Sequence, residues 1–300
     1  MVSDLQQWCV SNLKEISTIL AQRGAILFRG FEVDQPEKVE RFANVTINSI
    51  LQGNTEHRPV SNQSMVQIPV EYEKEQTLLW HNENTFNNQW PGKAIFACGQ
   101  PAEEGGETPL VDSRLVYDRL DEEVRQAFRE KGVMYERRYS ETDEIGLGWQ
   151  TIFNTADKRQ VERHCLKQSM SAEWTADGTL ITRAVRPSVH MQQETRRWSW
   201  INQAQHWHIA CLHKELREAV EALYEDGCYP RNCFFGDGSA IPDLYMKHIL
   251  ETYAENEFVF RWRKGDVLLV NNAIVAHGRK PYKGDRTIFV CFGDNKKFNE

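Results

Sequence analysis

The stretch Thr77-Leu-Leu-Trp-His-Asn-Glu-Asn-Thr-Phe86 carries a histidine and a glutamate two residues apart, His81 and Glu83. On an extended segment, residues with this spacing point to the same side of the backbone, so an imidazole nitrogen and a carboxylate oxygen would project toward one point. Such a pair, with coordination positions left open, suits a non-haem Fe(II) centre. A short His-x-Glu triplet alone also occurs as an exposed polar pair, so the rest of the chain must decide between the two interpretations.

A candidate for the third ligand lies far downstream. The run Val267-Leu-Leu-Val-Asn-Asn-Ala-Ile-Val-Ala-His277 is apolar, rich in β-branched residues and ends in a histidine, and Arg286 begins another such run nine residues later. We interpret His81, Glu83 and His277 as the two-histidine, one-carboxylate facial triad of an iron site.

Composition limits the possible partners and the cellular location. The formal net charge of −7 argues against nucleic acid as a partner, because phosphate binding requires a basic face. No basic leader is present and no apolar run approaches the roughly 20 residues of a membrane span, so we expect neither a secretion signal nor membrane insertion. The seven cysteines are odd in number and form no Cys-x-x-Cys pair, which favours free thiols in a reducing compartment and hence a cytoplasmic protein.

Hydrophobic periodicity and turn residues predict the elements. We expect helices over residues 5–20, 36–47, 113–131, 158–168, 212–224 and 242–253. We expect strands over residues 25–28, 93–98, 107–111, 133–139, 179–185, 198–201, 258–261, 266–270 and 287–292. Pro91-Gly92 is typical of a turn, and the polar residues 52–76 are typical of a long loop beside a site.

Strands dominate around both ligand segments, whereas helices gather at the N-terminus and between the two segments. This arrangement predicts a mainly β protein with added helices, built on a double-stranded β-helix (jelly-roll) core. The sequence shows no repeat and no domain boundary, so we expect a single domain over residues 1–300, with a large insertion at about 140–257 between the two metal-ligand segments.

The motifs together resemble a known family. His81-x-Glu83, Gly105-Gly106-Glu107-Thr108 and His277-Gly-Arg-Lys-Pro281 followed by Arg286 are similar, in order and separation, to the Fe(II)/2-oxoglutarate-dependent oxygenases of the taurine dioxygenase and clavaminate synthase group. The resemblance extends from Gly24-Ala-Ile-Leu-Phe-Arg-Gly-Phe31 to the last strand. It implies an enzyme that uses Fe(II), 2-oxoglutarate and O2, and that forms succinate and CO2 beside the oxidised product.

The resemblance also assigns roles to two residues of the cofactor site. Arg286 stands where the family holds the distal carboxylate of 2-oxoglutarate, for which a guanidinium group is a natural partner. Thr108 follows the first histidine at the family's usual distance and would add a hydroxyl to the same carboxylate.

Two positions narrow the chemistry that the family implies. Halogenating relatives replace the metal-binding carboxylate by a small residue, so Glu83 argues against halogenation. Val290 stands where the taurine enzymes carry a second arginine for the sulfonate, so a small sulfonate substrate is not expected.

The insertion indicates the substrate class. The segments 147–154, 182–187 and 200–205 are similar to a branch that includes amino-acid hydroxylases of nonribosomal-peptide pathways. This implies hydroxylation of an unactivated C–H bond in a small molecule, an amino acid that is either free or carried on a carrier protein. Desaturation or cyclisation would need only a different substrate pose. We expect the substrate wall to include Trp149, Arg186, Asn202 and Gln203, and Arg279 to contact substrate or cofactor or to pair with a surface acid.

Two rival functions remain open at this point. His206, His208 and His213 could hold zinc in a hydrolase, although their spacing matches no zinc motif. A cupin-like binding protein could have kept the fold and lost turnover, but the complete triad with Arg286 weighs against that loss. Nothing in the sequence indicates the oligomeric state.

Overall fold

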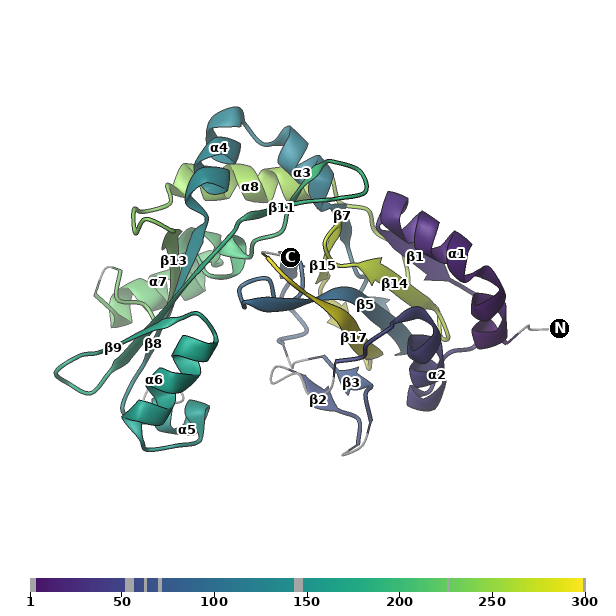
Figure 1. Ribbon diagram of the computed structural model, residues 1–300, viewed down its shortest axis with the longest axis horizontal. Helices are drawn as coiled ribbons and strands as arrows, with labels where there is room; N and C mark the ends of the chain where they lie inside the picture. Colours follow the sequence, from purple (N-terminus) through teal and green to yellow (C-terminus); the bar gives the residue numbers. More distant parts are fainter. Residues whose placement is uncertain are drawn as a thin grey trace.

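A computed structural model describes residues 4–51, 57–61, 64–69, 72–142, 148–225 and 227–298 (Figure 1). Its largest element is an antiparallel sheet, the major sheet, with the strand order β1-β14-β5-β17-β3-β2. Its strands are β1 (Ala25–Phe28), β14 (Val267–Asn271), β5 (Gln89–Gln100), β17 (Thr287–Lys297), β3 (Gln67–Ile68) and β2 (Arg58–Pro59). The central strands therefore join the middle of the chain to its C-terminal part.

The side chains of the central strands alternate between two cores, as expected of a sheet covered on both faces. Ile95 and Ala97 of β5 pack with α1 (Leu5–Arg23) and α2 (Pro36–Thr46), whereas Phe96 and Cys98 face the opposite way. In Figure 1 both helices lie on the right-hand side of the major sheet. One face of the sheet is thus closed by helices, and the other remains for a second sheet.

The second, minor sheet has the order β4-β15-β7 and carries the ligand candidates. Its strands are β4 (Leu78–His81), β15 (Val275–Arg279) and β7 (Leu110–Asp112). Leu110 and Val275 pack against β14, β5 and β17, while Val111 and Ala276 pack against helices on the other side. A small ribbon of β6 (Glu104–Gly105) and β16 (Tyr282–Lys283) adjoins it. The two facing sheets form the sandwich that a jelly-roll core requires.

The chain between β7 and β14 forms a further layer over the minor sheet (Figure 1). Its sheet has the order β13-β8-β10-β9, and a separate ribbon pairs β11 with β12. The strands are β8 (Val133–Tyr139), β9 (Ser171–Trp174), β10 (Leu180–Arg186), β11 (Val189–Met191), β12 (Trp198–Trp200) and β13 (Arg231–Phe235). The helices are α3 (Ser113–Arg119), α4 (Glu122–Lys131), α5 (Trp149–Phe153), α6 (Lys158–Lys167), α7 (Lys214–Leu223) and α8 (Asp243–Glu255), with the 3-10 turns η1 (Ala204–His206) and η2 (Ile209–Cys211).

Helix α1 shows how local rules position the major and minor sheets. The Asp4 side chain accepts a hydrogen bond from the N–H of Gln6 at its start, and Gly24 ends it with φ 82°. A Cβ at Gly24 would lie 2.5 Å from Cγ2 of Val275, which belongs to the strand of His277. Only glycine suits both the left-handed backbone and this close approach.

Several predicted elements are wrong in detail. The helix expected over 113–131 is broken into α3 and α4 at Leu120-Asp121. The Pro91-Gly92 turn lies inside β5, and the expected strand over 258–261 reduces to a single bridge from Phe258 to Leu110. The loop over 52–76 contains β2 and β3, although part of it falls outside the described residues. The layer over the minor sheet begins with α3, before the expected residue 140, and the single-domain organisation stays a prediction.

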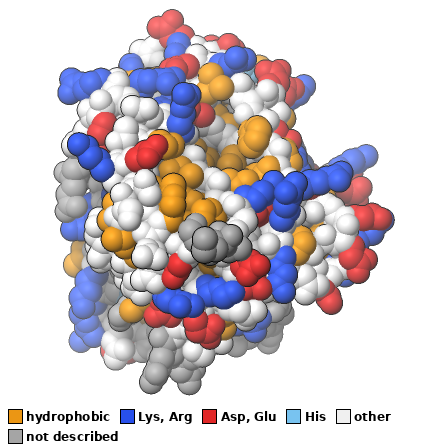
Figure 2. All heavy atoms as spheres, turned by 90° about the vertical axis from the view of Figure 1, so that its right-hand side faces the viewer, with side chains coloured by type: hydrophobic (Ala, Val, Ile, Leu, Met, Phe, Trp, Pro, Cys, Tyr) orange, Lys and Arg blue, Asp and Glu red, His pale blue; other side chains and the backbone are white. Residues whose placement is uncertain are grey.

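The free thiols that the cysteine pattern predicts are present in the structure. All seven cysteines are free, and no helix in the described ranges could span a membrane. Figure 2 shows the face that bears α1, where hydrophobic side chains gather among charged ones. An apolar cavity of about 340 Å³ opens between β1, β14 and β7, and none of the predicted site residues lines it.

Candidate metal centre

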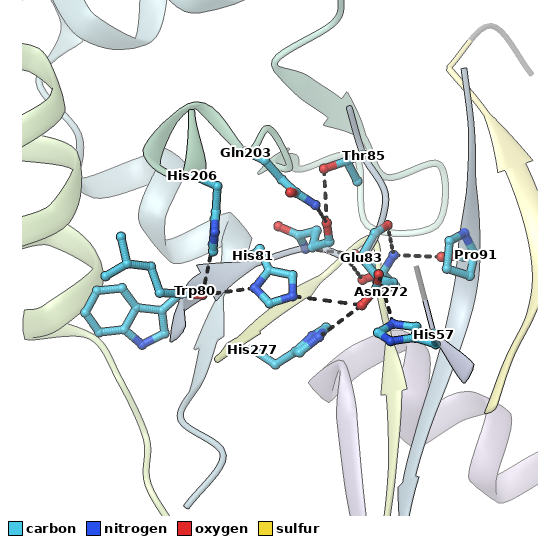
Figure 3. A network of polar contacts seen from close by, with 12 residues as sticks. His57, Trp80, His81, Glu83, Thr85, Pro91, Gln203, His206, Asn272 and His277 are labelled. Carbon is cyan, nitrogen blue, oxygen red and sulfur yellow. Dashed lines mark hydrogen bonds and ion pairs between the residues drawn. The ribbon is translucent and has the colours of Figure 1, made fainter. Parts of the chain in front are cut away.

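The structure brings the three predicted ligands together (Figure 3). Residues His81 and His277 are directly opposite each other on the antiparallel strands β4 and β15. Oε2 of Glu83 lies 3.9 Å from Nε2 of His81 and 3.7 Å from Nε2 of His277. All three side chains are largely buried, and one ligand atom from each lies within 4.8 Å of the others.

The backbone reaches this geometry differently from the expectation. Strand β4 ends at His81, and Glu83 lies in a turn where Asn84 has a left-handed φ of 58°. The same-side argument for an extended His-x-Glu segment was therefore wrong, although its consequence holds. The turn, rather than strand pleating, brings the carboxylate back toward the histidines.

Hydrogen bonding fixes the tautomer of His81. Its Nδ1–H donates to the carbonyl oxygen of Leu79 at 2.9 Å, since a carbonyl can only accept. Burial, with the neighbouring His277 and His206, lowers the pKa of His81 to about 3. The ring is therefore neutral, and the Nε2 lone pair faces the other two ligands.

The ring of His277 is held by packing. Its centroid lies 4.7 Å from that of Phe96 on β5 and 4.6 Å from that of His81. Because Phe96 belongs to the major sheet, the histidine lies between the two sheets at a fixed orientation. The sandwich thus positions one ligand through an aromatic contact and not through a hydrogen bond of its side chain.

Glu83 is a buried carboxylate with imidazole neighbours on both oxygens. Nε2 of His57 lies 3.7 Å from Oε1, opposite the histidines at Oε2. Burial alone would raise the pKa of Glu83, but His277 and His57 outweigh it and hold the pKa well below its usual range. Among the described residues no Lys or Arg pairs with Glu83, so a buried negative charge beside two imidazole nitrogens fits a divalent cation.

Two amides hold the backbone of the ligand turn. Asn272 Oδ1 accepts from the N–H of Glu83 at 2.7 Å, and its Nδ2 donates to the carbonyl oxygens of Glu83 and Pro91 (Figure 3). Gln203 Nε2 donates to the carbonyl oxygen of Asn82 at 2.6 Å. Gln203, predicted as substrate wall, thus contacts the ligand turn itself.

Sequence reasoning missed His57 and Asn272. Asn272 could have been found as a polar residue that interrupts an apolar run just before a ligand. His57 follows a polar stretch without periodicity, and no pattern relates it to Glu83.

The predicted 2-oxoglutarate residues lie beside the ribbon of β6 and β16. Nε of Arg286 donates to the carbonyl oxygen of Gly106 at 3.0 Å, and this arginine has no acidic partner among the described residues. Burial, followed by the charge of Arg279, lowers the pKa of Arg286 to about 10, so the group remains a cation at neutral pH. The buried Thr108 hydroxyl accepts from Nε1 of Trp262 at 3.1 Å.

The glycine pair of this motif has a steric role. A Cβ at Gly105 would lie 2.1 Å from the carbonyl oxygen of Pro281, and a Cβ at Gly106 would lie 3.0 Å from Cδ of Arg286. Both residues have a φ of 71°. The pair therefore allows β6 to approach β16 while Arg286 keeps its place.

Among the described residues, Arg279 contacts neither the triad nor an acidic side chain. Its guanidinium donates to the carbonyl oxygens of Tyr72, Glu73 and Gln76 and lies 5.0 Å from the ring centroid of Tyr282. These hydrogen bonds hold the segment before β4 in place, and the guanidinium group of Arg279 lies within electrostatic reach of Arg286.

Three other predicted substrate residues serve the protein's own structure. Arg186 donates to four backbone carbonyl groups, among them that of Phe86 at 3.2 Å, and Asn202 bonds the backbone of Ser188 and Ala204. Trp149 is buried in a separate core with Trp174, whose ring centroid is 4.9 Å away, in the part of the chain around α5 and α6. Residue 147, which begins the quoted segment 147–154, lies outside the described residues.

The zinc alternative is not supported by the geometry. His208 and His213 each accept a backbone N–H at the start of η2 and α7. His206 instead lies beside the triad: its Nε2 donates to the carbonyl oxygen of Leu79, and its ring centroid is 4.9 Å from that of His81. Of the described residues, only His81, Glu83 and His277 form a group able to hold a metal ion.

Comparison with known proteins shows the family of this chain. The model of the family described as taurine catabolism dioxygenase TauD, TfdA family, matches residues 2–292. The dapdiamide synthesis protein DdaC of Enterobacter agglomerans is 35% identical over 281 residues, which cover 93% of this chain and 84% of that protein. A clavaminate synthase-like protein of Arabidopsis thaliana is 30% identical over 288 residues, which cover 92% and 83% of the two chains.

A solved structure confirms the fold. The crystal structure of AAD-2 in complex with Mn(II) and N-oxalylglycine superposes with a TM-score of 0.53 at 14% identity, covering 96% of this chain and 88% of AAD-2. At this identity the likeness concerns the fold alone. The expected mainly β architecture with a jelly-roll core and added helices is confirmed.

Proposed function

This chain belongs to the TauD/TfdA family of dioxygenases, and on that premise we propose that it hydroxylates an unactivated C–H bond of an amino acid or an amino-acid-derived natural-product intermediate. As a member of the family it is a non-haem Fe(II) and 2-oxoglutarate-dependent dioxygenase that uses O2. The proposal concerns the substrate and the residues that serve it.

One observation carries the proposal: the buried cluster of His81, Glu83 and His277 contacts Phe96 of the inter-sheet core, and Arg286, which pairs with no described acid, lies within electrostatic reach of Cys98 of the same core. His81 Nε2, His277 Nε2 and Glu83 Oε2 would hold the iron, and Arg286 with Thr108 would hold the distal carboxylate of 2-oxoglutarate. When bound, the iron and its co-substrate supply the oxidising power, and the products beside the alcohol are succinate and CO2. The protein's own residues fix the ligands and exclude water by burial.

Two residues support oxidation of a C–H bond in something other than a small sulfonate. Glu83 keeps the metal-binding carboxylate that halogenation would displace. Val290 is buried in the inter-sheet core, so it offers no charge to a sulfonate. Similarity to a protein named for dapdiamide synthesis supports a natural-product substrate.

The spectrum of the anaerobic protein tests the site before any substrate is known. Fe(II) and then 2-oxoglutarate are added, and we expect a weak metal-to-ligand charge-transfer band in the visible range. Arg286→Ala should require much more 2-oxoglutarate for the same band, whereas His208→Gln, away from the triad, should behave as wild type.

Succinate release then tests the substrate class. Amino acids are offered free and attached to a carrier, and we expect one set to stimulate succinate formation above the uncoupled rate. Absence of the band with iron bound would contradict the cofactor assignment. A normal band with no stimulation by either set would contradict the substrate class alone.

A further inference from the structure

The layer above the minor sheet presents two arginines toward the metal centre. Arg137 of β8 and Arg231 of β13 are directly opposite each other on neighbouring antiparallel strands. Tyr135 and Cys233, two residues away on each strand, are buried in the core that includes Trp80 and Trp207, so all four side chains belong to the same face of the sheet. This face looks toward the minor sheet.

Directly opposed like charges destabilise a sheet, so the pair requires an explanation. On the other face of the same sheet the arginines are neutralised: Glu136 accepts from Arg138 at 3.0 Å and from Arg183 at 2.6 Å. Arg137 has no acidic partner among the described residues. The sheet thus neutralises its outer cations and leaves an inner one without a counter-charge.

Aromatic rings hold the two guanidinium groups in place. The central carbon of Arg137 lies 4.8 Å from the ring centroid of Trp207, and that of Arg231 lies 4.9 Å from the same centroid. Arg137 also lies 5.4 Å from the ring centroid of Phe86. Stacking fixes the plane of a guanidinium group, and the N–H edges of Arg137 remain available to an oxyanion.

The rings that hold the pair also connect it to the metal ligands. Trp207 follows His206, whose ring contacts that of His81, and Phe86 belongs to the same turn as Glu83. Arg231 is exposed and Arg137 is partly exposed, so a solute can reach both.

We propose that Arg137 and Arg231, stacked on Trp207, form an oxyanion-binding site that orients the substrate beside the metal centre. The inference rests on the proposed function and adds to it that the substrate carries an anionic group. Two sources share this chemistry: the carboxylate of a free amino acid, and the phosphodiester of the arm that tethers an amino acid to a carrier. Arg286 lies beside the ribbon of β6 and β16, so the two anions, co-substrate and substrate, would have separate cations.

Inorganic phosphate is a suitable probe because it needs no knowledge of the substrate. The protein is loaded with Mn(II) and N-oxalylglycine, which occupies the co-substrate position, and the relaxation of the phosphate 31P signal by Mn(II) is measured. Wild type should enhance relaxation strongly. Arg137→Met, which keeps the stem on the rings, should weaken phosphate binding about 10- to 100-fold, as expected for loss of a charged hydrogen bond.

Arg138→Met is the matched control, since it removes the neighbouring arginine from the outer face. Arg137→Lys should recover part of the phosphate binding that Arg137→Met loses. Arg231→Met should weaken phosphate binding as Arg137→Met does. Equal relaxation in wild type, Arg137→Met and Arg138→Met, or no enhancement in wild type with Mn(II) bound, would overturn the inference. Free Mn(II) in the electron paramagnetic resonance spectrum would instead show failure of the metal site and hence of the proposed function.

Competition identifies the source of the anion. Displacement of phosphate by amino acids but not by their carboxamides would assign the site to a free carboxylate. Displacement by phosphopantetheine but not by pantetheine would assign it to a carrier arm. Displacement by neither, in a protein that binds phosphate through Arg137, would overturn the assignment to substrate.

Discussion

At the scale of single residues, the orientation of the ligands depends on the contacts of their other polar atoms, those that do not face the metal position. The carbonyl oxygen of Leu79 takes the Nδ1–H of His81, and His57 faces the second oxygen of Glu83. With Oε1 turned to His57, Glu83 would offer Oε2 to a metal ion. Binding through one oxygen would leave coordination positions for co-substrate and O2.

His57 is therefore expected to strengthen metal binding without being a ligand. His57→Phe should keep the stacking on Phe292, now 5.3 Å between centroids, and lose the contact with the carboxylate. We expect Mn(II) affinity to fall about 10- to 100-fold, as measured by titration calorimetry. His164→Phe, an exposed position on α6, is the control, and unchanged affinity in His57→Phe would contradict the role.

Arg286 should affect the co-substrate far more than the metal. Arg286→Ala removes the cation for the distal carboxylate, so the dissociation constant of 2-oxoglutarate should rise by about 100-fold, the effect of a lost charged pair. Arg286→Lys should recover part of this affinity. Parallel titrations measure the affinities for Mn(II) and for 2-oxoglutarate. An equal fall in both affinities would indicate that Arg286 has a structural role instead.

At the scale of elements, local rules predicted most of what the structure shows. Strands 25–28 and 133–139 have the expected bounds, since each directly follows a glycine that ends a helix. The helix over 113–131 failed at Leu120-Asp121, because its apolar spacing continues across two helices that pack on one core. Phe258 pairs with a single residue, which periodicity alone cannot reveal.

The site was predictable only where chemistry and spacing coincide. The triad combined distinctive residue types with a β-rich setting, so its members could be named. The polar residues of the insertion could not be sorted in the same way. Arg186 and Asn202 satisfy backbone groups, whereas Arg137 looked no different in sequence from its neighbour Arg138, because the distinction depends on which face of β8 each occupies.

The turn η2 should make stability depend on pH. Burial lowers the pKa of His208, whose Nδ1 accepts from the N–H of Ala210 and whose Nε2–H donates to Ile241. Below the ordinary histidine pKa of about 6.5 the unfolded chain takes up a proton that the folded chain resists, so stability falls as pH falls.

Urea unfolding of the metal-free protein at pH 7.5 and pH 5.5 checks this. At pH 7.5 the free energy of unfolding of His208→Gln should be lower than that of wild type by about 1 kcal/mol per missing hydrogen bond. Between pH 7.5 and pH 5.5 this free energy should fall less in the variant than in wild type. If the free energy of unfolding of the variant falls as much as that of wild type, other groups cause the pH dependence.

At the scale of the whole molecule, the ligands connect distant parts of the chain. His81 and His277 lie on neighbouring strands, and the layer that carries Arg137 and Arg231 lies between them in sequence. A metal ion held by both histidines would therefore stabilise the minor sheet and the position of the layer above it.

Metal binding should raise the melting temperature accordingly. Mn(II) at 100 times its dissociation constant contributes about 2.7 kcal/mol, which corresponds to roughly 5 °C for a chain of this size. His277→Ala should abolish this shift, and His206→Ala should retain it because His206 is a neighbour and not a ligand. Scanning calorimetry with and without Mn(II) measures both, and a lost shift in His206→Ala would place that residue among the ligands.

The strand order of the major sheet has a consequence for how the protein is made. Strand β5 pairs with β14 and β17, and both come from residues 267–297. During synthesis this apolar strand therefore has neither neighbour until nearly all of the chain has left the ribosome. The nascent chain therefore exposes β5, the strand whose Phe96 later packs on His277. We expect its dependence on chaperones to end only when β17 has emerged.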